Sequence, residues 1–172
     1  MTIRRLLPAD AEAYRALMLE GYARHPDAFT STATEREALP LSWWEKRLDA
    51  SPAAEQVVFG VFVGDVLAGA AGLQFQAREK ARHKADLFGM YVVPSARGAG
   101  FGRQLVLALL DEAAAREGVR VVQLTVTEGN AAAQTLYAHC GFTPFGVEPF
   151  AVALGGVYLS KVHMWCAVAA LD

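Results

Sequence analysis

Cysteine is scarce in this chain of 172 residues, and neither sign of charge is in clear excess. The two cysteines, Cys140 and Cys166, form no CxxC pair and have no further thiolate or imidazole groups at the spacing of a zinc site. We therefore expect reduced, structural thiols and no metal. The formal net charge of −2, with basic residues scattered among acidic ones, argues against nucleic acid as a partner.

Long uncharged apolar runs are also missing, although 53% of the residues are hydrophobic. No run approaches the roughly 20 residues that a membrane-spanning helix needs, so no membrane partner is expected. The first ten residues lack the apolar core of a secretory signal. We therefore expect a cytoplasmic protein that forms one domain over residues 1–172.

The first half of the chain alternates between strand-like and helix-like patterns. It predicts a strand at residues 3–6, a helix over 10–21, an irregular stretch over 25–40, a short helix capped by Ser42, and strands over 57–63 and 66–76. Gly64-Asp65 between the last two strands has the composition of a tight hairpin turn. These two strands are therefore expected to be antiparallel neighbours.

The second half begins with residues 86–93, which are almost continuously apolar, as expected of a strand buried on both faces in the centre of a sheet. Gly89 interrupts this run, and an isolated glycine in a strand indicates a bulge or a close backbone approach. Then follow a helix that ends at a left-handed Gly118, a strand over 122–126, a helix capped by Asn130 and closed by Gly141, and strands near 142–147 and 157–167. The pattern predicts an α/β fold with a parallel centre and antiparallel ends.

The six residues 97–102, Arg-Gly-Ala-Gly-Phe-Gly, join the apolar strand to the next helix and have the composition of an anion site. Amides at a helix N-terminus are unpaired, the helix dipole favours negative charge, and glycines let the backbone approach a phosphate closely. Arg97 or Arg103 can add charge-assisted hydrogen bonds. A diphosphate is the predicted occupant.

Other interpretations of this glycine turn are open. A dinucleotide fingerprint requires a third glycine where the chain has Arg103, and no clear acidic ribose ligand ends the following strand. A phosphate loop of the GxxxxGK[ST] kind requires a Lys-Ser or Lys-Thr pair that does not follow these glycines. The glycines could also serve only to shape a tight strand-to-helix connection.

Residues 86–142 resemble the GNAT superfamily of N-acetyltransferases in three motifs. The first motif, Arg97-x-x-Gly100-x-Gly102, is similar to the family's Gln/Arg-x-x-Gly-x-Gly/Ala. The second is Met-Tyr-Val-Val-Pro at residues 90–94, which resembles the family's fourth strand. The third consists of Asn130, Tyr137 and Cys-Gly-Phe at residues 140–142, which resemble the family's next motif. The order of the earlier elements fits the family more loosely, and residues 30–40 and 145–156 carry no family signature.

The resemblance implies a single-domain α/β fold with a mixed central sheet of about six to seven strands and about four flanking helices. In such a fold the central parallel strands splay apart at a bulge, and Gly89 is well placed for one. Acetyl-CoA is the implied co-substrate, with no metal. The backbones of Tyr91 and Val93 would contact its pantetheine arm. The full set of implied cofactor-binding residues is Tyr91, Val92, Val93, Arg97, Gly98, Ala99, Gly100, Phe101, Gly102, Arg103 and Asn130.

The resemblance also implies two catalytic residues. Tyr137 matches the family tyrosine that is proposed as general acid for the departing thiolate, and Asp86 stands where related members place a glutamate that deprotonates the amine. A strand amide such as that of Tyr91 would stabilise charge on the thioester oxygen. Tyr137 as a core tyrosine, Asp86 as a solvated strand-end charge and Asn130 as a plain helix N-cap are the simpler alternatives.

Several other side chains are candidates for the acceptor site. Glu20, Glu35 and Glu128 are alternative bases, and the aromatic residues Tyr22, Phe29, Trp43 and Trp44 could either wall an acceptor pocket or belong to the core.

The implied reaction is direct transfer of an acetyl group from acetyl-CoA to a primary amine of a small molecule or peptide. It proceeds in a ternary complex, without a covalent enzyme intermediate. A noncatalytic acyl-CoA-binding module and a nucleotide-binding domain are the alternative functions. The identity of the acceptor, and whether the chain is a monomer or a homodimer, do not follow from the sequence.

Overall fold

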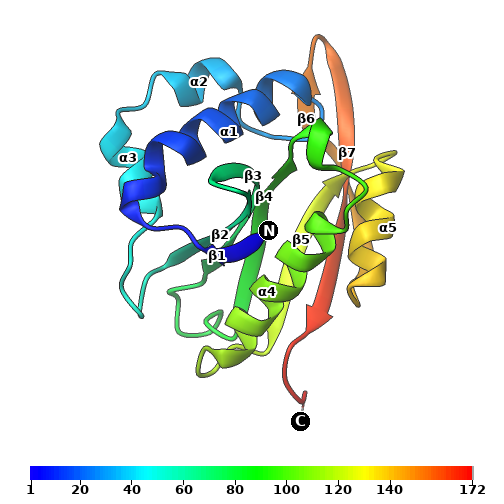
Figure 1. Ribbon diagram of the computed structural model, residues 1–172. Coiled ribbons are helices and arrows are strands. Elements are labelled where there is room, and N and C mark those ends of the chain that lie inside the picture. Colours follow the sequence, from blue (N-terminus) through cyan, green and yellow to red (C-terminus); the bar gives the residue numbers. More distant parts are fainter. Residues whose placement is uncertain (172) are drawn as a thin grey trace.

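The computed structural model describes residues 1–171 and contains a seven-stranded sheet with helices on both faces (Figure 1). The strands are β1 (Thr2–Arg5), β2 (Gln56–Val63), β3 (Val66–Phe75), β4 (Lys84–Val92), β5 (Val121–Thr127), β6 (Thr143–Leu154) and β7 (Val157–Ala167). The α-helices are α1 (Ala11–Arg24), α2 (Ala33–Glu37), α3 (Leu41–Arg47), α4 (Phe101–Ala115) and α5 (Ala131–His139), and short 3-10 turns occupy Pro8–Asp10 and Pro94–Ala96.

The strand order is β1-β2-β3-β4-β5-β7-β6, and every neighbouring pair is antiparallel except β4 and β5. This confirms the predicted mixed sheet with a parallel centre. It also confirms the hairpin of β2 and β3, in which Val63 pairs with Val66 across the Gly64-Asp65 turn. Within residues 1–171, none of the helices combines the length and the apolar character needed to cross a membrane.

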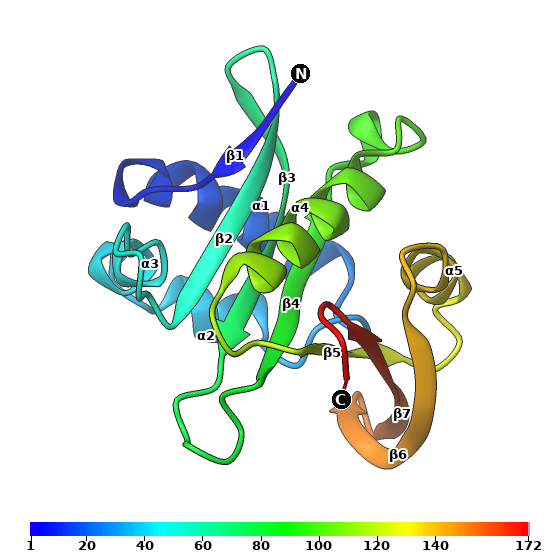
Figure 2. The same ribbon diagram turned by 90° about the horizontal axis from the view of Figure 1, so that it is seen from below.

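Two hydrophobic cores hold the layers together, one on each face of the sheet. Leu105, Val106 and Leu109 of α4 pack with Val122 and Leu124 of β5 in the first core. The second core joins α1 and α3 to the strands and includes Tyr14, Met18, Trp44 and Tyr91. Figures 1 and 2 show α1, α2 and α3 gathered together, apart from α4. The strands between the two cores therefore form a rigid frame for whatever lies at their ends.

The helices differ from the sequence prediction at three places. Residues predicted to be irregular contain α2, which Thr32 and Glu35 begin with a reciprocal capping box. Helix α3 starts two residues earlier than predicted because Pro40, not Ser42, is its N-cap residue. Helix α4 ends at Ala115, so that Gly118 (φ +83°) lies in the following turn and is not the cap. The structure thus has five α-helices instead of about four.

Strand β4 also differs from the prediction, because it is not buried on both faces along its length. Ala85, Leu87 and Tyr91 are buried, whereas the other residues of the strand are partly exposed. The pairing of β4 with β5 explains the difference: it covers only Lys84–Asp86 against Val121–Gln123. The rest of β4 has no strand neighbour on that side, and Phe88, Met90 and Val92 in this stretch are partly exposed.

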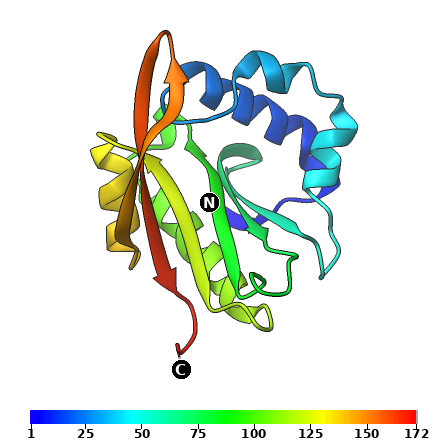
Figure 3. The same ribbon diagram turned by 180° about the vertical axis from the view of Figure 1, so that it is seen from behind.

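The separation of β4 and β5 is the central feature of the fold. Figure 3 shows the two strands close together where they begin and far apart where they end. The separation coincides with a bulge: Gly89 adopts φ +64°, and the register between β3 and β4 shifts between Ala70 and Gly72. The predicted splay of the parallel strands, with Gly89 at the bulge, is confirmed.

Candidate functional site

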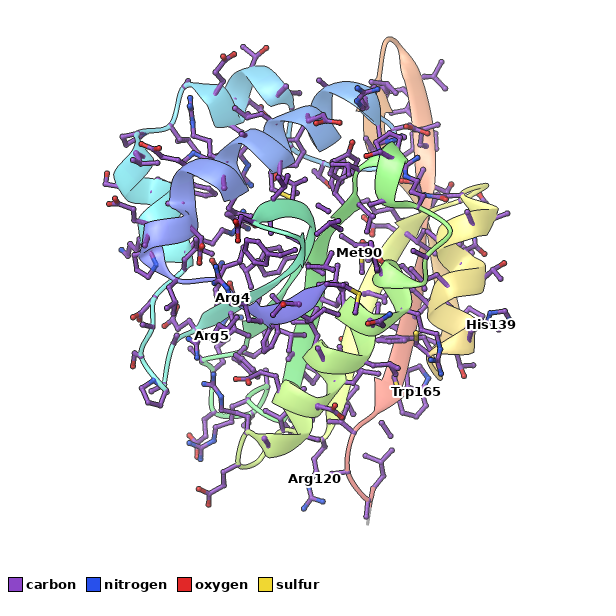
Figure 4. All side chains as sticks on the ribbon, in the orientation of Figure 1. Arg4, Arg5, Met90, Arg120, His139 and Trp165 are labelled. Carbon is purple, nitrogen blue, oxygen red and sulfur yellow. The ribbon has the colours of Figure 1, made fainter. Side chains whose placement is uncertain are left out.

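Two cavities meet where β4 and β5 separate. The first, which we call the wide cavity, has a volume of about 510 Å³ and lies between the end of β4, the glycine turn and α5. The second, the narrow cavity, has a volume of about 260 Å³ and lies between β4, β5 and the segment that precedes α2. Met90, labelled in Figure 4, lines both cavities, as do Phe29 and Asn130. The two cavities therefore form one continuous site.

The glycine turn forms the floor of the wide cavity. Gly98 (φ +81°) and Gly100 (φ +76°) both adopt left-handed backbone, and Gly100 is the N-cap of α4. The first amide to bond back along this helix is that of Gln104, which donates to Gly100 O (3.1 Å). The preceding amides, of Phe101, Gly102 and Arg103, thus have no intrahelical acceptor. They offer a row of donors to an anion at the positive end of a 15-residue helix.

The surroundings of two of these glycines also suit a bound ligand. A Cβ at Gly98 would meet no protein atom within 4 Å, so the space in front of it is open to a ligand. A Cβ at Gly102 would lie 3.2 Å from Leu136, which shows how closely α4 and α5 approach each other. The turn thus combines free amides, open space and a close helix contact, and it fits a diphosphate.

Arg97 is held in place at the rim of the wide cavity. Its Nε donates to the carbonyl of Val92 (3.0 Å) and its Nη2 to His25 Nε2 (3.0 Å). Its guanidinium carbon lies 5.8 Å from the centre of the Tyr91 ring. Arg103 lines the same cavity from the first turn of α4. Two guanidinium groups therefore flank the row of free amides.

The backbone of β4 faces the gap at alternate residues. The amide of Val93 donates to Ala68 O on β3 (2.9 Å). Because successive residues of a strand direct their backbone groups to alternate sides, Tyr91 and Val93 face β3, whereas Met90 and Val92 face the gap. Val92 lines the wide cavity and Val93 does not. Of the predicted cofactor contacts on this strand, Val92 thus faces the gap, whereas the backbones of Tyr91 and Val93 face β3, and their contact with pantetheine stays a prediction.

Tyr137 projects from α5 into the narrow cavity. Its side chain is 6% exposed and makes an edge contact with the Phe142 ring at 5.8 Å. Tyr137 is one of the residues that line this cavity. Burial raises the pKa of Tyr137 well above that of an exposed tyrosine, so its hydroxyl stays protonated. The side chain can therefore donate a proton into the cavity.

Asn130 begins α5 and stands at the boundary between the cavities. Its Oδ1 accepts from the Ala133 amide (3.2 Å), which confirms the predicted N-cap. It lines both cavities as well. Its capping bond fixes the position of α5 and with it the position of Tyr137, two turns further along the helix.

Asp86 lies away from these residues. It belongs to the part of β4 that is still paired with β5, and one of its carboxylate oxygens accepts a hydrogen bond from Gln76. Among residues 1–171, neither cavity has an Asp or Glu in its lining. Asp86 is two residues before Phe88, which lines the narrow cavity and lies on the same side of the strand, about 7 Å away along β4. Its predicted role as base remains a prediction.

The alternative carboxylates have other partners. Glu20 accepts from the Tyr91 hydroxyl (3.0 Å) and pairs with Arg24 (2.9 Å). Burial and this bond to Glu20 raise the pKa of Tyr91. Glu35 belongs to the capping box of α2. No group of three or more His, Cys, Asp or Glu side chains that could hold a metal ion occurs within residues 1–171.

The narrow cavity contains residues that the sequence analysis did not single out. Arg36 of α2, Arg47 of α3 and Lys161 of β7 line it together. These residues are far apart in the sequence and belong to no motif, so no sequence signal connects them. Of the four aromatic residues proposed for an acceptor pocket, Tyr22 and Phe29 line the narrow cavity. Trp44 is fully buried in the second core, and Trp43 packs against that core.

The chain is similar to known acetyltransferases. The sequence pattern of the Acetyltransferase (GNAT) family matches residues 16–142. A mycothiol acetyltransferase from Beutenbergia cavernae is 31% identical over 140 residues, which are 81% of this chain and 43% of that protein. The chain thus spans less than half the length of the curated relatives that it matches.

Two solved structures show the same fold over the full chain. An acetyltransferase of the GNAT family from Streptococcus pneumoniae has a TM-score of 0.87 and 24% identity, covering 98% of this chain and 99% of that one. The yncA protein from Salmonella typhimurium, solved with its cofactor acetyl-CoA, has a TM-score of 0.80 and 27% identity, covering 100% of this chain and 98% of that one.

Proposed function

Because the chain belongs to the acetyltransferase (GNAT) family, we propose that it is an N-acetyltransferase that transfers an acetyl group from acetyl-CoA to a primary amine. The observation that carries the proposal is the junction of two cavities at the separated ends of β4 and β5. One cavity has the donors for a diphosphate, and the other holds a protonated, buried tyrosine. Met90 and Asn130 line both, so a thioester at the junction would be reached from each side.

The wide cavity would hold acetyl-CoA, which supplies the acetyl group as an activated thioester. The amides of residues 98–103, with Arg97 and Arg103, would bind the pyrophosphate. The backbone amide of Val92, which faces the gap, would pair with the pantetheine arm, while its carbonyl holds Arg97. Asn130 would contact the same arm while it caps α5. The strand amide of Met90, which also faces the gap, would stabilise charge on the thioester oxygen.

The narrow cavity would hold the acceptor and the groups that move protons. The amine nitrogen bonds to the acetyl carbon as the carbon–sulfur bond breaks, in a ternary complex without a covalent enzyme intermediate. Starting from the ammonium form, the nitrogen loses two protons: the thiol gains one, through Tyr137 as general acid, and solvent receives the other. Asp86, which lines neither cavity, would take this second proton through a water molecule before it passes to solvent.

The proposal is tested by two measurements on the intact chain. Calorimetry should show binding of acetyl-CoA in preference to NAD or ATP, and release of free thiol should follow when a panel of small amines and peptides is added. Absence of acetyl-CoA binding would overturn the proposal, and preferential binding of NAD or ATP would favour a nucleotide-binding domain. Binding without thiol release on any amine would favour a noncatalytic acyl-CoA-binding module.

A further inference from the structure

The three basic residues of the narrow cavity converge from separate elements. Arg36 comes from α2, Arg47 from α3 and Lys161 from β7, and each is partly buried. The other lining residues include no Asp or Glu within the described part of the chain. The cavity into which Tyr137 projects is therefore positively charged.

Each basic side chain is held in position without a carboxylate partner. The guanidinium carbons of Arg36 and Arg47 lie 4.6 Å and 4.9 Å from the centre of the Trp43 ring. The Nε of Arg47 donates to Gln56 Oε1 (3.2 Å), and its guanidinium also lies 4.4 Å from the Phe88 ring centre. Lys161 Nζ donates to Thr30 Oγ1 (2.6 Å). These contacts orient the side chains but leave their charges uncompensated.

Along the described chain, the positive charges of the three cavity residues have no carboxylate partner. Arg4 pairs with Asp10 (2.8 Å) and Arg24 with Glu20 (2.9 Å), whereas in residues 1–171 none of the three cavity residues lies within 4.0 Å of a carboxylate. The Nε of Arg36, like those of Arg5 and Arg15, is buried without a hydrogen-bond partner within the described residues. Unpaired cationic groups that line one concave site focus a positive potential into it. A negatively charged group of a ligand can therefore pair with these cations.

We infer that the acceptor is a small amine that also carries a carboxylate, of the size and shape of an amino acid with an apolar side chain. The inference rests on the proposed function. Arg36, Arg47 and Lys161 would bind the carboxylate, while Tyr22, Phe29 and Phe88 would contact the apolar part. The cavity volume of about 260 Å³ suits a ligand smaller than a typical drug-sized molecule.

The same positive charges also favour the neutral form of the amine, which the reaction requires. The nucleophile must be a neutral amine, yet no carboxylate lines the cavity to deprotonate an ammonium. Nearby positive charges disfavour the charged form of an ammonium and so lower its pKa. A bound amino acid would keep its carboxylate paired with the basic residues and present its nitrogen in the neutral form. A simple alkylammonium would instead be repelled.

A matched series of acceptors tests the inference. Norleucine, norleucinamide and pentylamine share one side chain but differ in the carboxylate, and kcat/KM for each is measured by thiol release from acetyl-CoA. We expect norleucine to exceed both others by about 10- to 100-fold, the factor of a charge-assisted hydrogen bond. The amide has the less basic amine, so a preference for the acid cannot arise from a larger neutral fraction.

Variants show which residues cause the preference. Arg36→Gln and Lys161→Gln should each raise KM for norleucine about tenfold and should not raise KM for norleucinamide, which has no carboxylate to lose a partner. Arg82→Gln, at an exposed arginine between β3 and β4 that lines neither cavity, is the matched control and should change neither substrate. Lys161 is the safer variant for folding, because its side chain is held by a hydrogen bond to Thr30 and belongs to neither hydrophobic core.

The outcomes separate this inference from the proposed function. Equal or better turnover of norleucinamide and pentylamine would overturn the inference and leave the acetyltransferase intact. If thiol release is seen with none of the series, binding of norleucine to the protein saturated with CoA is measured by calorimetry. Absence of binding there, or binding equal to that of norleucinamide, overturns the inference as well. Absence of acetyl-CoA binding overturns both.

Discussion

The two cavities that meet at the splayed strands are built from different parts of the chain. The wide cavity is formed largely by one stretch, residues 90–103, and by α5, and its donors are mainly backbone amides at the start of a helix. The narrow cavity is formed by side chains from α1, α2, α3, β4, β5, α5 and β7. A binding site made of backbone depends on glycine and helix geometry, whereas one made of side chains can change its ligand through single substitutions.

The largest effect is expected at Tyr137, which projects into the junction from the narrow side. Tyr137→Phe removes the proposed proton donor and should lower kcat by about 10²- to 10⁴-fold without changing the affinity for acetyl-CoA. Steady-state kinetics with thiol detection measures both. Tyr158→Phe, at an exposed tyrosine of β7, is the matched control and should be fully active. An unchanged kcat in Tyr137→Phe would remove the tyrosine from the mechanism.

The pH profile of the parent enzyme sharpens this expectation. Burial raises the pKa of Tyr137, so the group loses its proton only above the normal tyrosine range near 10. The rate should therefore rise as the amine deprotonates and show no descending limb below about pH 10. A descending limb near pH 8 that disappears in Tyr137→Phe would contradict a strongly raised pKa.

The second effect tests whether the wide cavity depends on backbone. Gly100→Val places a branched side chain in left-handed backbone and at the N-terminus of α4. It should weaken acetyl-CoA binding by about 10- to 100-fold, the value of charge-assisted hydrogen bonds from the free amides. Calorimetry measures the dissociation constant.

Gly118→Val provides the control for backbone strain. Gly118 has a similar φ of +83° with no neighbouring atom within 4 Å, but it lies beyond the opposite end of α4. Both variants should lose roughly 1–2 kcal/mol of folding stability, and only Gly100→Val should lose affinity. Equal affinity losses would mean that strain, and not the amide row, is responsible.

The third effect concerns Asp86, which does not line the narrow cavity. Asp86→Asn keeps an acceptor for Gln76 but removes the charge, and a base that acts through water should cost about tenfold in kcat/KM near neutral pH. The loss should diminish as pH rises, because the amine then deprotonates without help. Asp65→Asn, in the exposed turn between β2 and β3, is the control. An unchanged pH–rate profile in Asp86→Asn would exclude Asp86 as the base.

The smallest effect is expected where the two cavities share a wall. Thr127 Oγ1 donates to Asp27 O (2.7 Å) and so ties β5 to the segment that carries Ala28 and Phe29, which line both cavities. Thr127→Val removes a bond with a net value of about 0.5–1.5 kcal/mol and should raise KM for both substrates by roughly 2- to 10-fold. Thr143→Val, at an exposed threonine, is the control. A change in KM for one substrate alone would show that the wall is not shared.

Local sequence patterns predicted the parts of this site that depend on neighbours in the chain. The hairpin turn at Gly64-Asp65, the bulge at Gly89 and the cap at Asn130 each follow from residue types within a few positions. The family resemblance lies in the same kind of local motif, at Arg97, Gly100 and Gly102. The errors were local too: the α2 capping box at Thr32 and Glu35 lay in a stretch that was predicted to be irregular.

The sequence by itself determined the α/β class, the glycine turn and the bulge at Gly89, because backbone conformation and helix N-termini depend on short, contiguous patterns. The tertiary structure alone decided three further features. It aligned the β4 backbone so that Val92 and not Val93 faces the gap, it placed Asp86 outside the cavity lining, and it brought Arg36, Arg47 and Lys161 together. The three basic residues come together because α2, α3 and β7 pack around one sheet, and no short sequence pattern predicts that packing.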